Sequence, residues 1–121
     1  MTAIHHLALR VRDCDVAARF YERALGLREM RRVEADGDLR TVWFRAGETV
    51  LMLERSLKGE GPVEGSGHVL VFGTSDLEAA EQRLRRLDIK VTDRTSSTIY
   101  VADPDGHRVG LSIYQFEGVS P

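Results

Sequence analysis

Apolar and polar residues alternate along residues 4–11, which is the period of a strand with one buried face. Residues 12–27 then place apolar side chains three and four positions apart, the period of a helix with one buried face. Asp13 or Asp15 is suited to cap the start of this helix, and Gly26 is suited to end it. Alternation returns in three further segments that turn-forming residues separate. These predicted strands span residues 27–35, 39–46 and 49–55.

The same order of elements is repeated in the second half of the chain. Residues 67–89 align with residues 5–27 at an offset of 62, which places His68 on His6. Ser75 or Asp76 is the corresponding helix cap. Internal repetition of this kind is a signal about the whole fold. Three short strands are predicted to close the second half, at residues 90–94, 97–103 and 107–114.

This repeat predicts an α+β fold built from two βαβββ modules within one structural domain. The modules cover residues 1–57 and 67–117, and residues 58–66 are the predicted linker loop, because glycine and proline recur there. A half of this length buries too small a core by itself. The two sheets are therefore expected to pair and to curl around a central cleft, which is a natural ligand site.

Composition and charge exclude several classes of protein. The chain has 121 residues, is 42% hydrophobic and 30% charged, and carries a net charge of −2. This balance lacks the excess of positive charge that is typical of nucleic-acid-binding proteins. No apolar run is long enough to span a membrane. The N-terminus does not resemble a signal peptide, and the single cysteine, Cys14, has no partner for an internal disulfide. We expect a cytoplasmic protein.

Two histidines and a glutamate are the candidate metal ligands. His6 and His68 occupy equivalent places in the repeat, and Glu54 ends the last strand of the first half. Imidazole and carboxylate groups together suit Zn, Ni, Fe, Mn or Co. The alternatives are that the histidines are structural and that Glu54 faces solvent. His107 lies beside the turn at residues 103–106 and is expected to be exposed.

Strand alternation also selects the side chains expected to line the cleft. Arg10 is suited to a carboxylate or phosphate, and apolar side chains would form the walls. Trp43 and Tyr100 are expected in the core more than in the cleft. The predicted substrate pocket comprises Arg10, Met52, Leu70, Phe72, Gly110, Ser112 and Tyr114.

Several sequence pieces resemble the vicinal oxygen chelate superfamily, which includes glyoxalase I, bleomycin-resistance proteins and extradiol dioxygenases. They are "HHLALRVRD", "ARFYERALGL", "LMLER", "GHVLVF" and "DPDGHRVGL", and together they cover nearly the whole chain. The resemblance implies paired βαβββ modules and, often, a homodimer. It also implies metal ligands in the order His, Glu, His, Glu, which correspond here to His6, Glu54 and His68. The fourth position holds Gly110.

Gly110 leaves three outcomes open. The three remaining ligands could hold the metal, with Glu54 also serving as the catalytic base; Tyr114 or Glu117 could replace the fourth ligand; or no metal binds, and the glycine opens volume for a bulkier ligand. The first outcome predicts a glyoxalase-like metalloenzyme, of lyase, isomerase or dioxygenase type, acting on a small oxygenated molecule. The last predicts a metal-free small-molecule-binding protein of the bleomycin-resistance type.

Overall fold

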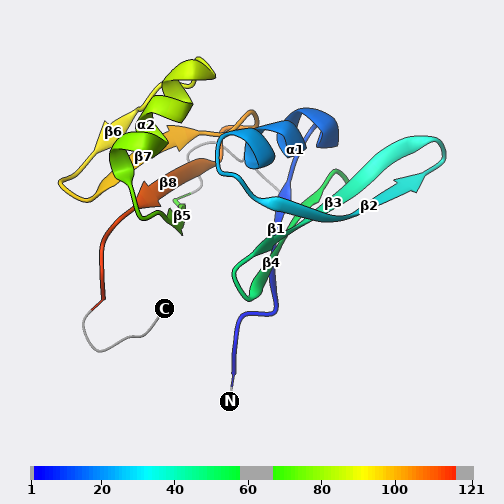
Figure 1. Cartoon of the computed structure of the whole chain (residues 1–121). Coiled ribbons are helices and arrows are strands. Elements are labelled where there is room, and N and C mark those ends of the chain that lie inside the picture. The colour runs from blue at the N-terminus through cyan, green and yellow to red at the C-terminus, as the bar shows by residue number, and fades with distance from the viewer. Residues whose placement is uncertain (1, 58–66, 117–121) are drawn as a thin grey trace. The chain divides into compact units, whose positions relative to one another are not determined.

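The computed structural model describes residues 2–57 and 67–116, which form two compact units within residues 1–66 and 67–121. The described residues contain two helices and eight strands in two mixed four-stranded sheets (Figure 1), which confirms the predicted α+β fold of two βαβββ modules. The predicted linker, residues 58–66, and Glu117 lie outside the described residues. A cleft between the modules stays a prediction.

The elements follow the order that the repeat predicts. The first unit comprises β1 (His6–Arg10), α1 (Cys14–Arg23), β2 (Arg28–Ala35), β3 (Asp38–Ala46) and β4 (Thr49–Glu54). The second comprises β5 (Leu70–Gly73), α2 (Leu77–Arg86), β6 (Asp93–Arg94), β7 (Thr98–Ala102) and β8 (Arg108–Ser112).

In the first unit, helix α1 covers one face of a sheet with strand order β1-β4-β3-β2. Strands β1 and β4 are parallel, and the remaining pairs are antiparallel. The core between helix and sheet is apolar; it includes Leu9, Ala17, Tyr21, Phe44 and Leu53, all buried. Because side chains alternate along a strand, their strand neighbours point to the opposite side, which we call the helix-free face of the first sheet.

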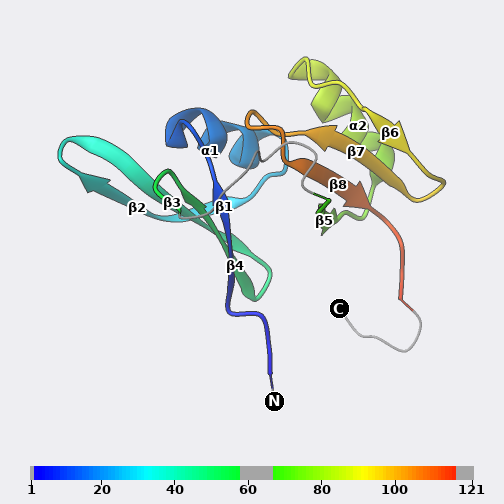
Figure 2. The same ribbon diagram turned by 180° about the vertical axis from the view of Figure 1, so that it is seen from behind.

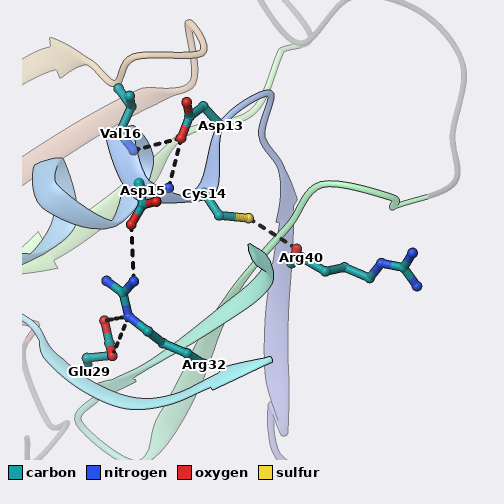
Figure 3. A network of polar contacts seen from close by, with 7 residues as sticks. All are labelled: Asp13, Cys14, Asp15, Val16, Glu29, Arg32 and Arg40. Carbon is teal, nitrogen blue, oxygen red and sulfur yellow. Dashed lines mark hydrogen bonds and ion pairs between the residues drawn. The ribbon is translucent and has the colours of Figure 1, made fainter. Parts of the chain in front are cut away.

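Asp13 fixes the start of α1, which settles the choice between the two candidate caps. Its side chain accepts hydrogen bonds from the backbone N–H groups of Asp15 (2.9 Å) and Val16 (3.1 Å), as Figure 3 shows. These groups have no partner within the helix, so the cap satisfies them. Asp15 instead reaches β2, where Arg32 bridges it to Glu29 at 3.1 and 2.9 Å (Figure 3).

In the second unit, α2 packs against β7 and β8 of a sheet with order β5-β8-β7-β6, which Figure 2 shows from behind. Asp76 caps this helix through the N–H of Ala79 at 3.0 Å. The core is smaller here and is also apolar; it includes Ala80, Leu84, Ile99, Val101, Val109 and Leu111. The opposite side is the helix-free face of the second sheet.

The structural repeat differs from the sequence repeat by one residue. The two caps, Asp13 and Asp76, are 63 residues apart, and both helices have 10 residues. Ala17 is therefore equivalent to the buried Ala80 rather than to Ala79. His6 is equivalent to Val69, so the offset of 62 that paired His6 with His68 is wrong for the strand and the helix start. The offset returns to 62 in the turns after the helices, where the residues with positive φ are Gly26 and Asp88.

The turns that follow the two helices differ in length by one residue. Gly26 has a positive φ of 69° and ends the first helix as predicted, while Leu27 N–H bonds to the carbonyl of Tyr21 at 3.1 Å. Asp88 takes the equivalent left-handed conformation in the second unit, with φ 60°. The sequence favoured 62 because Ala17 and Ala18 both match alanines at that offset, whereas at 63 only Ala17 does and Ala18 falls on Glu81.

Candidate functional site

His6 and Glu54 lie on the same helix-free face but are not neighbours. The parallel pairing of β1 with β4 places His6 opposite Val50, and Glu54 opposite Arg10. Four residues along a strand and one strand across correspond to about 14 Å between the two Cα atoms. Two ligands of one metal have their donor atoms within about 4.4 Å of each other. Within this unit, the structure does not bring His6 and Glu54 together.

The Glu54 carboxylate is engaged by its own sheet. One oxygen accepts a hydrogen bond of 2.6 Å from the Thr41 hydroxyl, and the other accepts from the Ser56 backbone N–H at 3.1 Å. Thr41 is buried, with 5% of its surface exposed. Metal binding or proton transfer by Glu54 would compete with these bonds. Its geometry is that of a carboxylate that joins the ends of β3 and β4.

The side chains beside Gly110 fill the place where a fourth ligand would project. Gly110 pairs with Tyr100 on β7 and with Val71 on β5. A Cβ atom on residue 110 would lie 3.1 Å from Tyr100 Cε1 and 3.2 Å from Val71 Cγ2. The expectation that the glycine opens volume at this point is therefore wrong, because the Tyr100 ring already lies across it.

Each helix-free face carries an arginine over an aromatic ring. The Arg108 guanidinium lies 4.1 Å from the centre of the Tyr100 ring, and an ion pair of 3.1 Å to Asp93 also holds it. In the first sheet, Arg31 lies 5.8 Å from the centre of the Trp43 ring. Both rings are half-buried and belong to these faces, although they were expected mainly in the cores.

The indole N–H of Trp43 is an unsatisfied donor. Its nitrogen is buried and has no hydrogen-bond partner among the described residues. Such a group costs free energy unless water or another molecule accepts its hydrogen bond. Trp43 is paired across strands with Met52, one of the predicted site residues, so an acceptor here would lie beside the centre of the helix-free face.

The predicted pocket residues are divided between different surfaces. Arg10 and Met52 lie on the helix-free face of the first sheet, and Gly110 and Ser112 on that of the second. Leu70 and Phe72 pair with the buried Val109 and Leu111, so they point to the helix side, and the expectation that they share a face with Gly110 is wrong. The one-residue difference in the repeat reverses their direction.

Ser112 and Tyr114 mark the end of the last strand. The Ser112 hydroxyl accepts a hydrogen bond of 2.7 Å from Thr98 and is 3.3 Å from the Ser97 carbonyl. Strand β8 ends at Ser112, two residues before its predicted end. Tyr114 is 61% exposed and makes an edge-to-face contact with Phe116.

His68 contacts His107 instead of occupying a place equivalent to His6. Its Nε2 atom lies 3.3 Å from Nδ1 of His107. His107 is only 4% exposed, so the prediction of an exposed side chain is wrong. Among residues 2–57 and 67–116, no group of three or more His, Cys, Asp or Glu side chains is placed to hold a metal ion. The three-ligand centre of His6, Glu54 and His68 stays a prediction, because its members belong to different units.

Reasoning from the sequence missed the arginine–aromatic pairs and the histidine pair. The sequence did hold a signal for the pair of Arg108 with Tyr100. The "DPDG" turn fixes the register of its hairpin, which sets Tyr100 opposite Gly110 and Ala102 opposite Arg108. The register of β5 could not be read in this way, because a parallel partner is not set by a local turn.

The sequence matches the family model described as Glyoxalase/Bleomycin resistance protein/Dioxygenase superfamily over residues 3–111. The chain therefore belongs to this superfamily, and the predicted resemblance is confirmed. No helix in the described part of the chain has the length and apolar character needed to cross a membrane.

Individual relatives are distant. The chain is 29% identical over 114 residues to "Uncharacterized protein YwbC" of Bacillus subtilis (strain 168), covering 85% of this chain and 90% of that protein. Among solved structures it is similar to the fosfomycin resistance protein FosX from Mesorhizobium loti, with TM-score 0.78, 22% identity and coverage of 96% and 94%. It is also similar to TnmS3, an antibiotic binding protein from Streptomyces sp. CB03234, with TM-score 0.74, 20% identity and coverage of 93% and 95%.

Proposed function

We propose that this protein binds a small organic molecule without the metal centre that its superfamily resemblance implies, as a sequestering protein of the bleomycin-resistance type. The observation that carries the proposal is the Tyr100 ring, which lies where the fourth metal-binding carboxylate would project. The separation of His6 from Glu54 by four residues of strand register supports the same view. A metalloenzyme using these two residues has no comparable support.

The two arginine–aromatic pairs indicate the chemistry of the ligand. An aromatic ring offers a flat apolar surface, and a guanidinium held above it adds a positive charge and several hydrogen-bond donors. The unsatisfied indole N–H of Trp43 adds one more donor. A planar, unsaturated molecule that carries carboxylate, phenolate or carbonyl oxygens suits these groups. The names of TnmS3 and FosX, an antibiotic binding protein and a fosfomycin resistance protein, are consistent with such a role.

Calorimetric titration with a panel of aromatic antibiotics, including bleomycin, tests this proposal. The protein is titrated once with excess EDTA and once with added Zn or Ni. We expect binding that is unchanged by EDTA and that weakens roughly three- to tenfold in Tyr100→Ala, since an aromatic contact contributes about 0.5–1.5 kcal/mol. Trp43 is the only tryptophan of the chain, so its fluorescence reports separately on the first sheet.

Arg108→Ala and Arg94→Ala form a matched comparison for the charge. Both side chains are exposed and ion-paired, but Arg94 pairs with Glu81, away from the Tyr100 ring. Only Arg108→Ala is expected to weaken the binding of an anionic ligand. Ligand binding or turnover that requires added metal, and that is lost in both His6→Gln and Glu54→Gln, would contradict the proposal.

A further inference from the structure

Positive charge is concentrated at one end of the helix-free face of the first sheet. The pairing of the four strands arranges the side chains of this face in rows that run across the sheet. The first row holds Arg28, Arg45, Val50 and His6, and the second holds Arg31, Trp43, Met52 and Ala8. Neither row contains a carboxylate. We call Arg28, Arg31 and Arg45 the arginine cluster.

A β-bulge brings two of these arginines onto the same face. Residues three apart on a regular strand point to opposite faces. The pairing of β2 with β3 shifts by one residue at Met30, which becomes an extra residue in β2. Arg28 lies opposite Arg45 before this shift. Arg31 lies opposite Trp43 after it and therefore shares the face of Arg28. Bulges that redirect a side chain in this way are frequent beside functional sites.

The neighbouring arginine of β2, Arg32, points to the helix side and is neutralised there. Its guanidinium group lies 2.9 Å from the Glu29 carboxylate and 3.1 Å from that of Asp15 on α1 (Figure 3). The arginine cluster differs: within residues 2–57 and 67–116, none of its three members forms an ion pair, and neither does Glu48 in the turn after β3. The cluster is therefore a concentration of uncompensated positive charge.

Arg28 and Arg45 form a like-charged pair across two strands. Side chains directly opposite each other have Cβ atoms about 4.5–5.5 Å apart, and like charges in such a pair are destabilising. Arg31 is the diagonal neighbour of Arg45, at about 7–8 Å. All three side chains are exposed, so their guanidinium groups are accessible to a ligand. An anion bound between them would remove the repulsion and would accept hydrogen bonds from more than one guanidinium group.

We propose that the arginine cluster binds the phosphate group of a small phosphate monoester. A guanidinium group matches two phosphate oxygens through parallel hydrogen bonds. A phosphate monoester carries a charge of about −1.5 to −2 near neutral pH, so it suits several arginines better than a carboxylate does. The rest of the molecule would lie over the second row. There the buried indole nitrogen of Trp43, which has no partner among the described residues, offers one further donor.

This site goes beyond the proposed function in the group that it binds and in the residues that bind it. The proposed function is carried by Tyr100 in the second unit, and the two proposals share only Arg31 and Trp43. A phosphate site at Arg28 and Arg45 requires neither the Tyr100 ring nor a metal. The alternative is a solvated surface that attracts anions only through its net charge, and the test below separates the two.

Titration of the full chain with phenyl phosphate, in a chloride buffer of low ionic strength, tests the site. Calorimetry gives the affinity, and the fluorescence of Trp43, the only tryptophan of the chain, reports binding at the first sheet. We expect one equivalent to bind. The affinity should fall at least about tenfold in Arg28→Gln and in Arg45→Gln, as for the loss of a charge-assisted hydrogen bond.

Arg32→Gln is the matched control, because it removes the same charge from the same strand but from the opposite face. It should bind phenyl phosphate as the wild type does. Benzoate, which has the same ring and a single charge, should bind at least about tenfold more weakly. Inorganic phosphate should also bind more weakly, because it has no ring to cover the second row.

Thermal unfolding supplies a second measurement on the same variants. Without ligand, Arg28→Gln and Arg45→Gln should be at least as stable as the wild type, because each removes a repelling charge. Phenyl phosphate should raise the Tm of the wild type and of Arg32→Gln more than that of the other two. Failure to fold is therefore not expected to obscure the result.

Three outcomes would overturn the proposal. Equal affinity in the wild type, Arg28→Gln and Arg45→Gln would show that the cluster does not bind the phosphate group. An equal loss in Arg32→Gln would show attraction by net charge alone. Equal affinity for phenyl phosphate and inorganic phosphate would exclude recognition of an ester. The antibiotic titrations that compare the wild type with Tyr100→Ala contain no phosphate ester, so either proposal can fail while the other stands.

Discussion

The ring of Tyr100 lies across the backbone of Gly110 on the neighbouring strand, within 3.2 Å of the point where a side chain at residue 110 would begin. The guanidinium of Arg108 lies 4.1 Å from the centre of the same ring. Gly110 is thus a packing partner of an aromatic side chain and not an empty position. An aromatic residue beside a glycine in a neighbouring strand is a recognised way to cover the glycine's exposed backbone.

Enlarging Gly110 tests this relationship. Gly110→Ala should be nearly neutral, because the tight contact opposes the gain from removing a glycine within a strand. Gly110→Glu should lower the free energy of unfolding by about 1–3 kcal/mol, since its larger side chain must displace Tyr100. Urea unfolding measures both values. In the double variant with Tyr100→Ala, the added cost of Gly110→Glu should largely disappear; an equal cost with and without the ring would contradict the packing relationship.

The two helix caps provide a matched pair of variants. Asp13→Ala and Asp76→Ala should each lower the free energy of unfolding by about 1 kcal/mol, because each removes an acceptor for helix N–H groups. Glu78→Ala is the control, since it lies in the first turn of α2 without serving as the cap, and should change stability by only a few tenths of a kcal/mol. Thermal and urea unfolding measure these effects. Equal losses in all three variants would argue against the assigned caps.

The fold was predictable because local patterns determine most of it. Alternation, helical spacing and the turn at residues 103–106 gave the order of elements, and Gly26 gave a helix end. The candidate site was predicted less well. The inferred His6–His68 equivalence required an offset of 62, whereas the caps and strand faces require 63. One residue reverses every side chain of a strand, so a small error in alignment moved His68, Leu70 and Phe72 to the opposite face.

Glu54 could not be placed from the sequence for a related reason. Its residue type suggested a ligand, but its partner across the parallel pair depends on the register of β1 with β4, which no local turn encodes. The buried Thr41 hydroxyl that binds its carboxylate comes from β3 and is likewise a tertiary contact. Chemical type was therefore visible in the sequence, and spatial neighbourhood was not.

The Thr41–Glu54 hydrogen bond should be measurable in stability. Thr41→Val removes the donor while keeping a similar shape, and should cost about 1–3 kcal/mol because the acceptor is a carboxylate. Glu54→Gln retains an acceptor for Ser56 and a group that can bond to Thr41, so it should cost less. Urea unfolding of both single variants and of the double variant gives the coupling between the two residues. A coupling near zero would show that the 2.6 Å contact contributes nothing in solution.

Cys14 should be a slow nucleophile although it is the first residue of a helix. A helix N-terminus usually lowers the pKa of a thiol. Here burial, followed by the charge of Glu54, raises the pKa of Cys14 above its ordinary value. The thiol is 2% exposed and donates to the Arg40 carbonyl at 3.1 Å (Figure 3). At pH 8, alkylation by iodoacetamide should be at least about tenfold slower in the folded protein than in urea, because only the exposed thiolate reacts.

The same shift predicts a dependence of stability on pH. The folded protein retains the Cys14 proton at pH values where the unfolded chain has lost it, because the folded-state pKa is the higher of the two. The stabilisation is therefore complete below the ordinary thiol pKa and declines as the pH rises toward and through the folded-state pKa. Cys14→Ala should remove this loss of stability at alkaline pH. The amount by which the urea midpoint of the wild type exceeds that of the variant should therefore shrink or reverse between about pH 8 and pH 10. Glu54→Gln should lower the pKa of Cys14 and speed its alkylation. An unchanged alkylation profile in that variant would show that burial alone sets the shift.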